Sequence, residues 1–267
     1  MSLDARPFVM ASIAAVTVLV FVYGHLYTSE RKTYILLWTF GWFSFALAYT
    51  FRYIILATQP SGMLQIFNYS ASLFGLWFII QGTVTFINIK FPKWCAYGLG
   101  IALFCYLAGF TIKLSYHVYI IPTVGVFCAM YLWTGIMFIR FRQVNVSMRY
   151  AVGWSFIFWG VFIAAYPIFR IFTLLPETVG YLCIGVTGLM AGTSLIAVYF
   201  QKIHETIINN ENRLRYISMH DRLTGLYNRA YFEEELKKFD STDNLPISII
   251  MGDVNGLKLM NDTFGHY

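Results

Sequence analysis

Charged residues are scarce in this sequence of 267 residues. They make up 12% of it, against about 25% in a typical soluble domain, while hydrophobic residues make up 58%. The shortage is uneven, because only Asp4, Glu30 and Glu177 are acidic before residue 201, whereas residues 201–267 carry an ordinary share of charge. This division predicts a membrane domain at residues 1–200, followed by soluble sequence.

Cysteine is also sparse, and it forms no metal or redox motif. The sequence contains no C-x-x-C pair and no metal-ligand spacing, and its four cysteines all lie in apolar segments: Cys95, Cys105, Cys128 and Cys183. We interpret them as small buried residues. A cleavable signal peptide is missing too, because the first apolar stretch is long and no A-x-A-like site follows it.

Seven apolar runs are long enough to cross a bilayer, for which about 20 residues are needed. Acidic residues are absent from these runs, so they show no proton or sodium relay of a transporter. Glycines recur within them, as close helix packing in lipid requires. The runs cover residues 7–27, 33–57, 64–87, 94–112, 117–139, 148–175 and 178–200. We predict an all-α bundle of seven transmembrane helices that acts as a sensor or an anchor.

The basic residues between these runs predict the orientation. The first, third and fifth loops hold most of them: Arg31, Lys32, Lys90, Lys93, Arg140, Arg142 and Arg149. The alternate side holds Arg6 and Lys113. Short cytoplasmic loops carry the excess of Lys and Arg, so we expect the N-terminus outside and the C-terminus in the cytoplasm, in the inner (cytoplasmic) membrane. The net charge of +6 therefore gives no reason to expect a nucleic-acid partner.

Polar residues gather near the outer ends of the spans, namely Arg52, Gln65, Asn68, His117 and Arg170. Ionisable residues at membrane depth usually face the bundle interior and mark a function. One interpretation is a sensor pocket, open to the outside and cationic, that receives a small anionic or polar ligand. The other is that both arginines reach to lipid headgroups. The sequence leaves both interpretations open.

The last run continues into an amphipathic segment at residues 201–218. Its apolar positions are spaced three and four residues apart, with one polar member: Phe200, Ile203, Ile207, Asn210, Leu214 and Ile217. This spacing is typical of a coiled-coil seam, in which an Asn would specify register. We favour a signalling helix that forms a dimeric stalk. The alternative is a single amphipathic helix that packs on its own domain.

Two polar clusters follow the stalk. Residues 219–229 read MHDRLTGLYNR, where Gly225 marks the end of a helix and Asn228 the start of the next. Residues 247–251 read ISIIM, which predicts a short buried strand with Asp253 just after it. The carboxyl end of a strand is a common place for catalytic carboxylates in α/β folds.

Taken together, D-x-L-T-G-L-x-N-R at 221–229 and G-D-x-N-G-L-K-x-x-N-D-x-x-G-H at 252–266 resemble the first part of the GGDEF family of diguanylate cyclases. The order and the separation of the two motifs also agree. The resemblance covers about residues 219–267. It implies the N-terminal part of an α/β GGDEF domain, ferredoxin-like and similar to the cyclase and polymerase palm. It also implies that two facing domains make cyclic di-GMP from two molecules of GTP.

The resemblance further implies roles for single residues. Asp253 and the carbonyl of Val254 would bind catalytic Mg²⁺ or Mn²⁺, which prefer hard oxygen ligands. Backbone N–H groups of Gly256 and Leu257 would face the triphosphate, and Lys258 would neutralise charge in catalysis.

Other implied roles concern the base and the domain's own structure. Asn261 would bind the guanine edge, while Asp221 and Arg229 would form a structural pair that positions the first helix. Asn255 departs from the family pattern, because many members carry a second Asp there. Gly256 and Leu257 likewise replace a commoner aromatic or charged pair.

The family's second metal carboxylate and its G-G-[DE]-E-F turn do not occur in residues 1–267. We therefore expect a truncated domain that is inactive as given, in a protein whose full length would be a cyclase. Two alternatives stay open: a degenerate GTP-binding module that regulates another output domain, and a non-enzymatic receptor that acts through its dimeric stalk. A histidine kinase fits less well, because Gly225 stands where its phosphoacceptor box needs proline.

Overall fold

The computed structural model describes residues 4–58, 62–114, 116–171, 176–239, 246–253 and 255–265. The chain divides into two compact units, Met1–Ile203 and His204–Tyr267.

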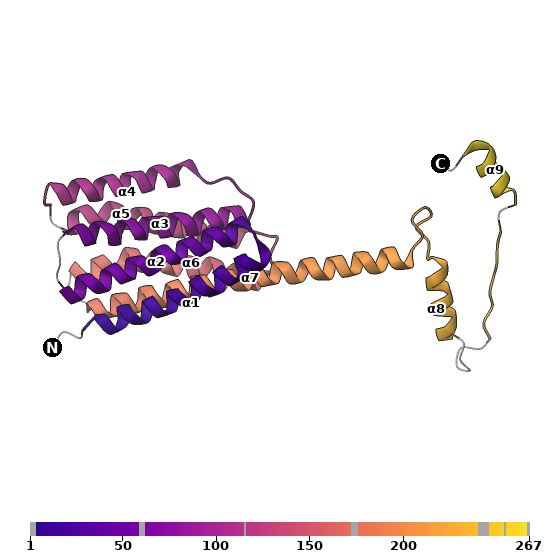
Figure 1. Cartoon of the computed structure of the whole chain (residues 1–267), viewed down its shortest axis with the longest axis horizontal. Coiled ribbons are helices and arrows are strands. Elements are labelled where there is room, and N and C mark those ends of the chain that lie inside the picture. The colour runs from indigo at the N-terminus through magenta and orange to yellow at the C-terminus, as the bar shows by residue number, and fades with distance from the viewer. Residues whose placement is uncertain are drawn as a thin grey trace. The chain divides into compact units, whose positions relative to one another are not determined.

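Seven helices of the described chain are long and apolar enough to span a membrane, as the sequence predicts. They are α1 (Arg6–Glu30), α2 (Thr33–Thr58), α3 (Gly62–Phe86), α4 (Lys93–Thr111), α5 (Tyr116–Arg140), α6 (Val146–Ile171) and α7 (Glu177–Met219) (Figure 1). Each of the seven predicted runs overlaps one of these helices, although residues 172–175 of the sixth run lie outside the described residues. Lipid offers no hydrogen bonds, so a segment that crosses it has to satisfy its backbone internally, as a helix does. The predicted orientation stays a prediction.

Aromatic rings fill the centre of the first unit. The Trp42 ring of α2 and the Trp159 ring of α6 are parallel to within 3°, with centroids 6.0 Å apart. Tyr131 of α5 stacks on Trp159 at 4.4 Å, and all three side chains are buried. These rings join α2, α5 and α6 into one core, which large flat side chains can fill without voids.

Helix α7 packs into the bundle through a face of small residues. A Cβ atom on Gly192 would lie 2.5 Å from Cδ1 of Leu19, and one on Gly185 would lie 2.4 Å from Oγ of Ser12. The Tyr23 hydroxyl donates to the Gly192 carbonyl at 2.8 Å. Helices that approach this closely need glycine at the contact, so the prediction of glycine-mediated packing is confirmed here.

Among the described glycines, the closest approach to the backbone of another helix lies between α5 and α6. A Cβ atom on Gly135 would lie only 2.5 Å from the carbonyl oxygen of Gly153. Backbone cannot move aside as a flexible side chain can, so this crossing requires glycine at that position.

The second unit holds the end of α7 and two short helices, α8 (Arg229–Phe239) and α9 (Leu257–Phe264) (Figure 1). Its described residues contain no strand.

The predicted buried strand at 247–251 is wrong for this structure. These residues have no regular structure, and Ile250 and Met251 are 98% and 91% exposed. A strand is stabilised by ladder bonds to a neighbour, and the described residues offer none. The α/β fold expected for residues 219–267 stays a prediction.

Replacing Gly135 with alanine tests the α5–α6 crossing. We expect Gly135→Ala to lower the free energy of unfolding by about 1–3 kcal/mol, the usual cost of overpacking. The matched control is Gly125→Ala on the same helix, where a Cβ would meet nothing within 4 Å. Thermal unfolding of the two variants in detergent measures the difference. Equal midpoints would contradict the close crossing.

Candidate functional site

A tight turn joins α7 to α8. The Asp221 N–H donates to the Leu226 carbonyl at 2.8 Å, and the Asn228 N–H donates to the Met219 carbonyl at 2.8 Å. Gly225 has a φ of 70°, which glycine adopts without strain. The first motif therefore builds a closed turn. Gly225 does not end a helix as predicted, because α7 ends at Met219, six residues earlier, and α8 begins at Arg229.

The Asp221 side chain holds this turn together. Its Oδ1 accepts hydrogen bonds from the Thr224 N–H at 2.9 Å, the Thr224 hydroxyl at 2.9 Å and the Leu223 N–H at 3.1 Å. The bonds from Thr224 and then from Leu223 lower the pKa of Asp221, because they favour the charged carboxylate.

Asp221 and Arg229 do not pair with each other in the structure. Nε of Arg229 donates instead to Oε1 of Glu233 at 2.6 Å, four residues further along α8. This ion pair raises the pKa of Arg229. Local partners satisfy both residues, since a side chain at i+4 lies within easy reach on a helix.

Asn228 lies at the start of the next helix, as predicted, and also makes a bond to α7 that the sequence analysis missed. Its Oδ1 accepts a hydrogen bond from the Tyr231 N–H at 2.9 Å, which caps the start of α8. Its Nδ2 donates to the Ser218 carbonyl at 2.6 Å. One side chain thus ties the beginning of α8 to the end of α7.

A ladder of rings runs beside this turn and was also missed. Tyr216 stacks on His220 at 4.0 Å between centroids, His220 lies 4.5 Å from Tyr227, and Tyr227 stacks on Tyr231 at 3.9 Å. The His220 Nδ1–H donates to the Gly225 carbonyl at 2.9 Å. Tyr216 and His220 are four residues apart before the turn, and Tyr227 and Tyr231 are four residues apart after it. This spacing was the signal in the sequence.

The second motif places its residues around the start of α9. Asp253 is exposed and lies three residues before Gly256. Gly256 has a φ of 79°, and its carbonyl accepts a hydrogen bond from the Met260 N–H at 3.0 Å. Leu257 is the first residue of α9, and Lys258 follows it. Backbone N–H groups in the first turn of a helix have no partner within that helix.

Two predicted site residues lie outside this description. Val254 is not among the described residues, and neither is the side chain of Asn261. Within the described part of the chain, no group of three or more His, Cys, Asp or Glu side chains could hold a metal ion. The described residues therefore do not by themselves build the predicted Mg²⁺ or Mn²⁺ site.

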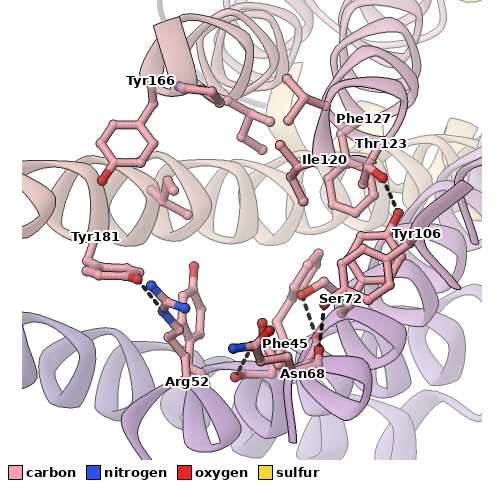
Figure 2. Close-up of a pocket in the computed structure, with 18 of the residues that line it drawn as sticks. Phe45, Arg52, Asn68, Ser72, Tyr106, Ile120, Thr123, Phe127, Tyr166 and Tyr181 are labelled. Atoms are coloured by element: carbon pink, nitrogen blue, oxygen red, sulfur yellow. Dashed lines mark hydrogen bonds between the residues drawn. The ribbon is translucent and has the colours of Figure 1, made fainter. Parts of the chain in front are cut away.

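A cavity of about 630 Å³ lies inside the helix bundle of the first unit (Figure 2). Arg52 of α2 and Gln65 and Asn68 of α3 line it, so the structure brings three of the predicted pocket residues to one cavity. The side chains of the other two, His117 and Arg170, lie outside the described part. Whether the cavity binds a ligand stays a prediction.

Hydrogen bonds hold the polar side chains of the cavity. Arg52 Nε donates to the Tyr181 hydroxyl, and the guanidinium carbon lies 5.3 Å from the centroid of that ring. Asn68 Nδ2 donates to the Ala48 carbonyl at 2.6 Å. The Tyr106 hydroxyl donates to the Gln65 carbonyl at 3.2 Å.

Fold and site together define a protein with seven candidate membrane helices and a separate C-terminal unit. Residues 218–267 match the family described as diguanylate cyclase, GGDEF domain. The C-terminal segment thus matches the GGDEF domain family behind helices apolar enough to span a membrane, and the resemblance seen in the two motifs is confirmed. No curated protein and no solved structure matches the chain.

The pKa of Asp221 provides a test of the turn. In the folded turn it lies below its ordinary value of 3.8, so the carboxylate stabilises the turn above that pH. This contribution is lost as the pH falls through the lowered pKa. We expect Thr224→Ala, which removes one donor, to raise the pKa of Asp221 toward 3.8. Carboxyl ¹³C NMR titration measures both proteins; a value of 3.8 in both would contradict the hydrogen-bonded turn.

Proposed function

We propose that this protein is a membrane sensor that controls the synthesis of cyclic di-GMP from two molecules of GTP. The observation that carries the proposal is the GGDEF match at residues 218–267, behind seven candidate membrane helices. In the proposed reaction the 3′-hydroxyl of one GTP attacks the α-phosphate of the other. Each attack forms one phosphodiester bond, releases pyrophosphate and frees one proton, and two attacks close the ring.

Residues of the second motif would hold the phosphates. The N-terminus of a helix attracts anions through its open N–H groups and its dipole, and α9 begins at Leu257, directly after Gly256. Lys258 would add positive charge close to the same phosphates. Asn261 would bind the guanine edge, since an amide both donates and accepts hydrogen bonds.

Asp253 would contribute one ligand to a divalent metal ion, Mg²⁺ or Mn²⁺, together with the Val254 carbonyl. One carboxylate does not satisfy such an ion, which takes about six oxygen ligands. The remaining protein ligands have to come from a second acidic residue, such as the family's second metal carboxylate. Asn255 favours a second candidate function, a degenerate module that binds GTP and regulates another output domain, because an amide supplies no negative charge there.

The proposed topology puts the GGDEF segment on the side of the membrane where GTP is available. The basic loops between the spans favour a cytoplasmic C-terminus in the inner membrane.

Removing the proposed metal ligand tests the enzyme hypothesis. We expect Asp253→Ala, made in the protein encoded by the complete gene, to lower cyclic di-GMP formation by about 100-fold or more, as loss of one preorganised electrostatic group does. Glu234→Ala is the control, because it removes an exposed carboxylate of the same unit, one that pairs with Lys238. Chromatography of the nucleotides measures the rate. Equal rates in the two variants would contradict a catalytic Asp253, and lack of conversion by the unaltered protein would contradict the cyclase.

We also propose that two chains associate through the stalk. On this chain Ile207, Leu214 and Ile217 are exposed along one face of α7, and Leu214 is 67% exposed. An apolar stripe in water favours association, and the spacing of three and four residues matches a coiled-coil seam. A second copy of the same stripe would cover it.

Cysteine cross-linking tests this dimer. We expect Ile207→Cys, in the seam, to form a disulfide between two chains on mild oxidation, because disulfides need Cα atoms about 4.4–6.8 Å apart. Asn212→Cys, on the opposite face of the helix, should stay monomeric. Non-reducing gels measure the dimer against the background of the four native cysteines. Equal cross-linking of both variants would contradict the proposed seam.

A further inference from the structure

Residues of six helices, α2 to α7, line the cavity in the bundle. Its wall on α2 consists of Phe45, Ala48, Tyr49, Arg52 and Ile55, which recur at helical spacing along one face. At a rise of about 1.5 Å per residue, this face runs for about 15 Å along the helix. Cavities of 300–1,000 Å³ are the usual size of small-molecule sites, and this one measures about 630 Å³.

One end of the cavity is cationic. Among the described residues that line it, Arg52 alone carries a full charge. Figure 2 shows its guanidinium directed toward the Tyr181 hydroxyl, which accepts its Nε–H. A guanidinium has five N–H donors in a planar fork that suits carboxylates, and its attraction for an anion is stronger within a bundle than in water.

The other end is apolar and aromatic. Phe45 lies seven residues before Arg52 on α2, about 10 Å along the helix. Phe127 of α5 (Figure 2) and Trp159 of α6 also line the cavity. Burial of a flat, apolar ligand against such a lining is favourable, whereas a strongly hydrated group would lose its water there.

Several polar groups of the lining form hydrogen bonds within the protein. Asn68 donates to a backbone carbonyl, Ser72 donates to the Asn68 carbonyl at 3.0 Å, and the Tyr69 and Thr123 hydroxyls bond each other. Tyr69 also stacks on Tyr106 at 3.6 Å. These walls are neutral and held in place, so charge selectivity rests on Arg52.

We propose that this cavity binds a small organic monoanion with one carboxylate at Arg52 and a flat apolar body of about 10 Å reaching toward Phe45. This proposal rests on the sensor role proposed above. It is more specific than the small anionic or polar ligand that the sequence led us to expect. Tyr181 and Ile184 of α7 also line the cavity, so the ligand would touch the helix that continues into the GGDEF segment.

The test compares naphthalene-1-acetate with naphthalene-1-acetamide, which has nearly the same shape and no charge. Equilibrium dialysis measures binding of each compound to the full chain in phosphatidylcholine nanodiscs at neutral pH, with empty nanodiscs as background. We expect the acid to bind about 10-fold or more tightly than the amide, the range for a charge-assisted hydrogen bond.

Four variants locate the site. Arg52→Gln should abolish the preference for the acid, and Arg52→Lys should keep part of it. Arg142→Gln, which removes an exposed arginine from a loop, should leave binding unchanged. Ser72→Phe should weaken both compounds by filling the cavity.

Three outcomes would overturn the proposal: no binding of either compound by the unaltered chain, equal binding of acid and amide, or full preference retained in Arg52→Gln. Because the assay contains no GTP, it can succeed when the cyclase hypothesis fails, and it can fail when that hypothesis holds.

Discussion

The unbroken backbone of α7 is the constraint on which the rest of the structure depends. One helix runs from Glu177 to Met219, and its first part packs against the bundle while its last part carries the turn of the GGDEF segment. The hydrogen-bonded ladder of an α-helix resists bending and twisting, which is the physical basis of the signalling role proposed for α7. Close packing at Gly185 and Gly192 leaves α7 few alternative positions in the bundle.

This constraint relates the cavity to the proposed catalytic segment. A ligand between α2, α5 and α6 would also touch α7 through Tyr181. It could control the C-terminal segment only by binding one position of α7 more tightly than another, because a ligand shifts an equilibrium by its difference in affinity. At the far end of the helix, Asp221 and Asn228 hold the turn to α8 through short bonds. A loose turn at that point would dissipate the movement.

Sequence was sufficient for the membrane helices and insufficient for parts that depend on distant contacts. Length and apolarity predict a membrane span locally, so all seven were found. The segment at 247–251 has the composition of a strand, yet a strand needs partners that the described residues do not supply. Arg52, Gln65 and Asn68 were selected by polarity, whereas the aromatic wall, for example Phe127, looked like ordinary core until the helices were placed.

The two motifs illustrate the same limit in the second unit. The residues of the two motifs were enough to indicate the GGDEF family, because the family match spans both motifs. The partner of Arg229 could not be read from the motif, since Glu233 competes for it at one helical turn. Asn228 was interpreted as a helix start, but its second bond to Ser218 depends on how the turn folds.

The most direct test of the account is the rate of cyclic di-GMP formation after residues are inserted into α7 behind Asn209, in the protein encoded by the complete gene. Two added residues turn the following part by about 200°, whereas seven added residues restore the seam to within about 20°. The account predicts that the seven-residue insertion keeps the rate and that the two-residue insertion lowers it. Equal rates for both insertions would contradict coupling through α7.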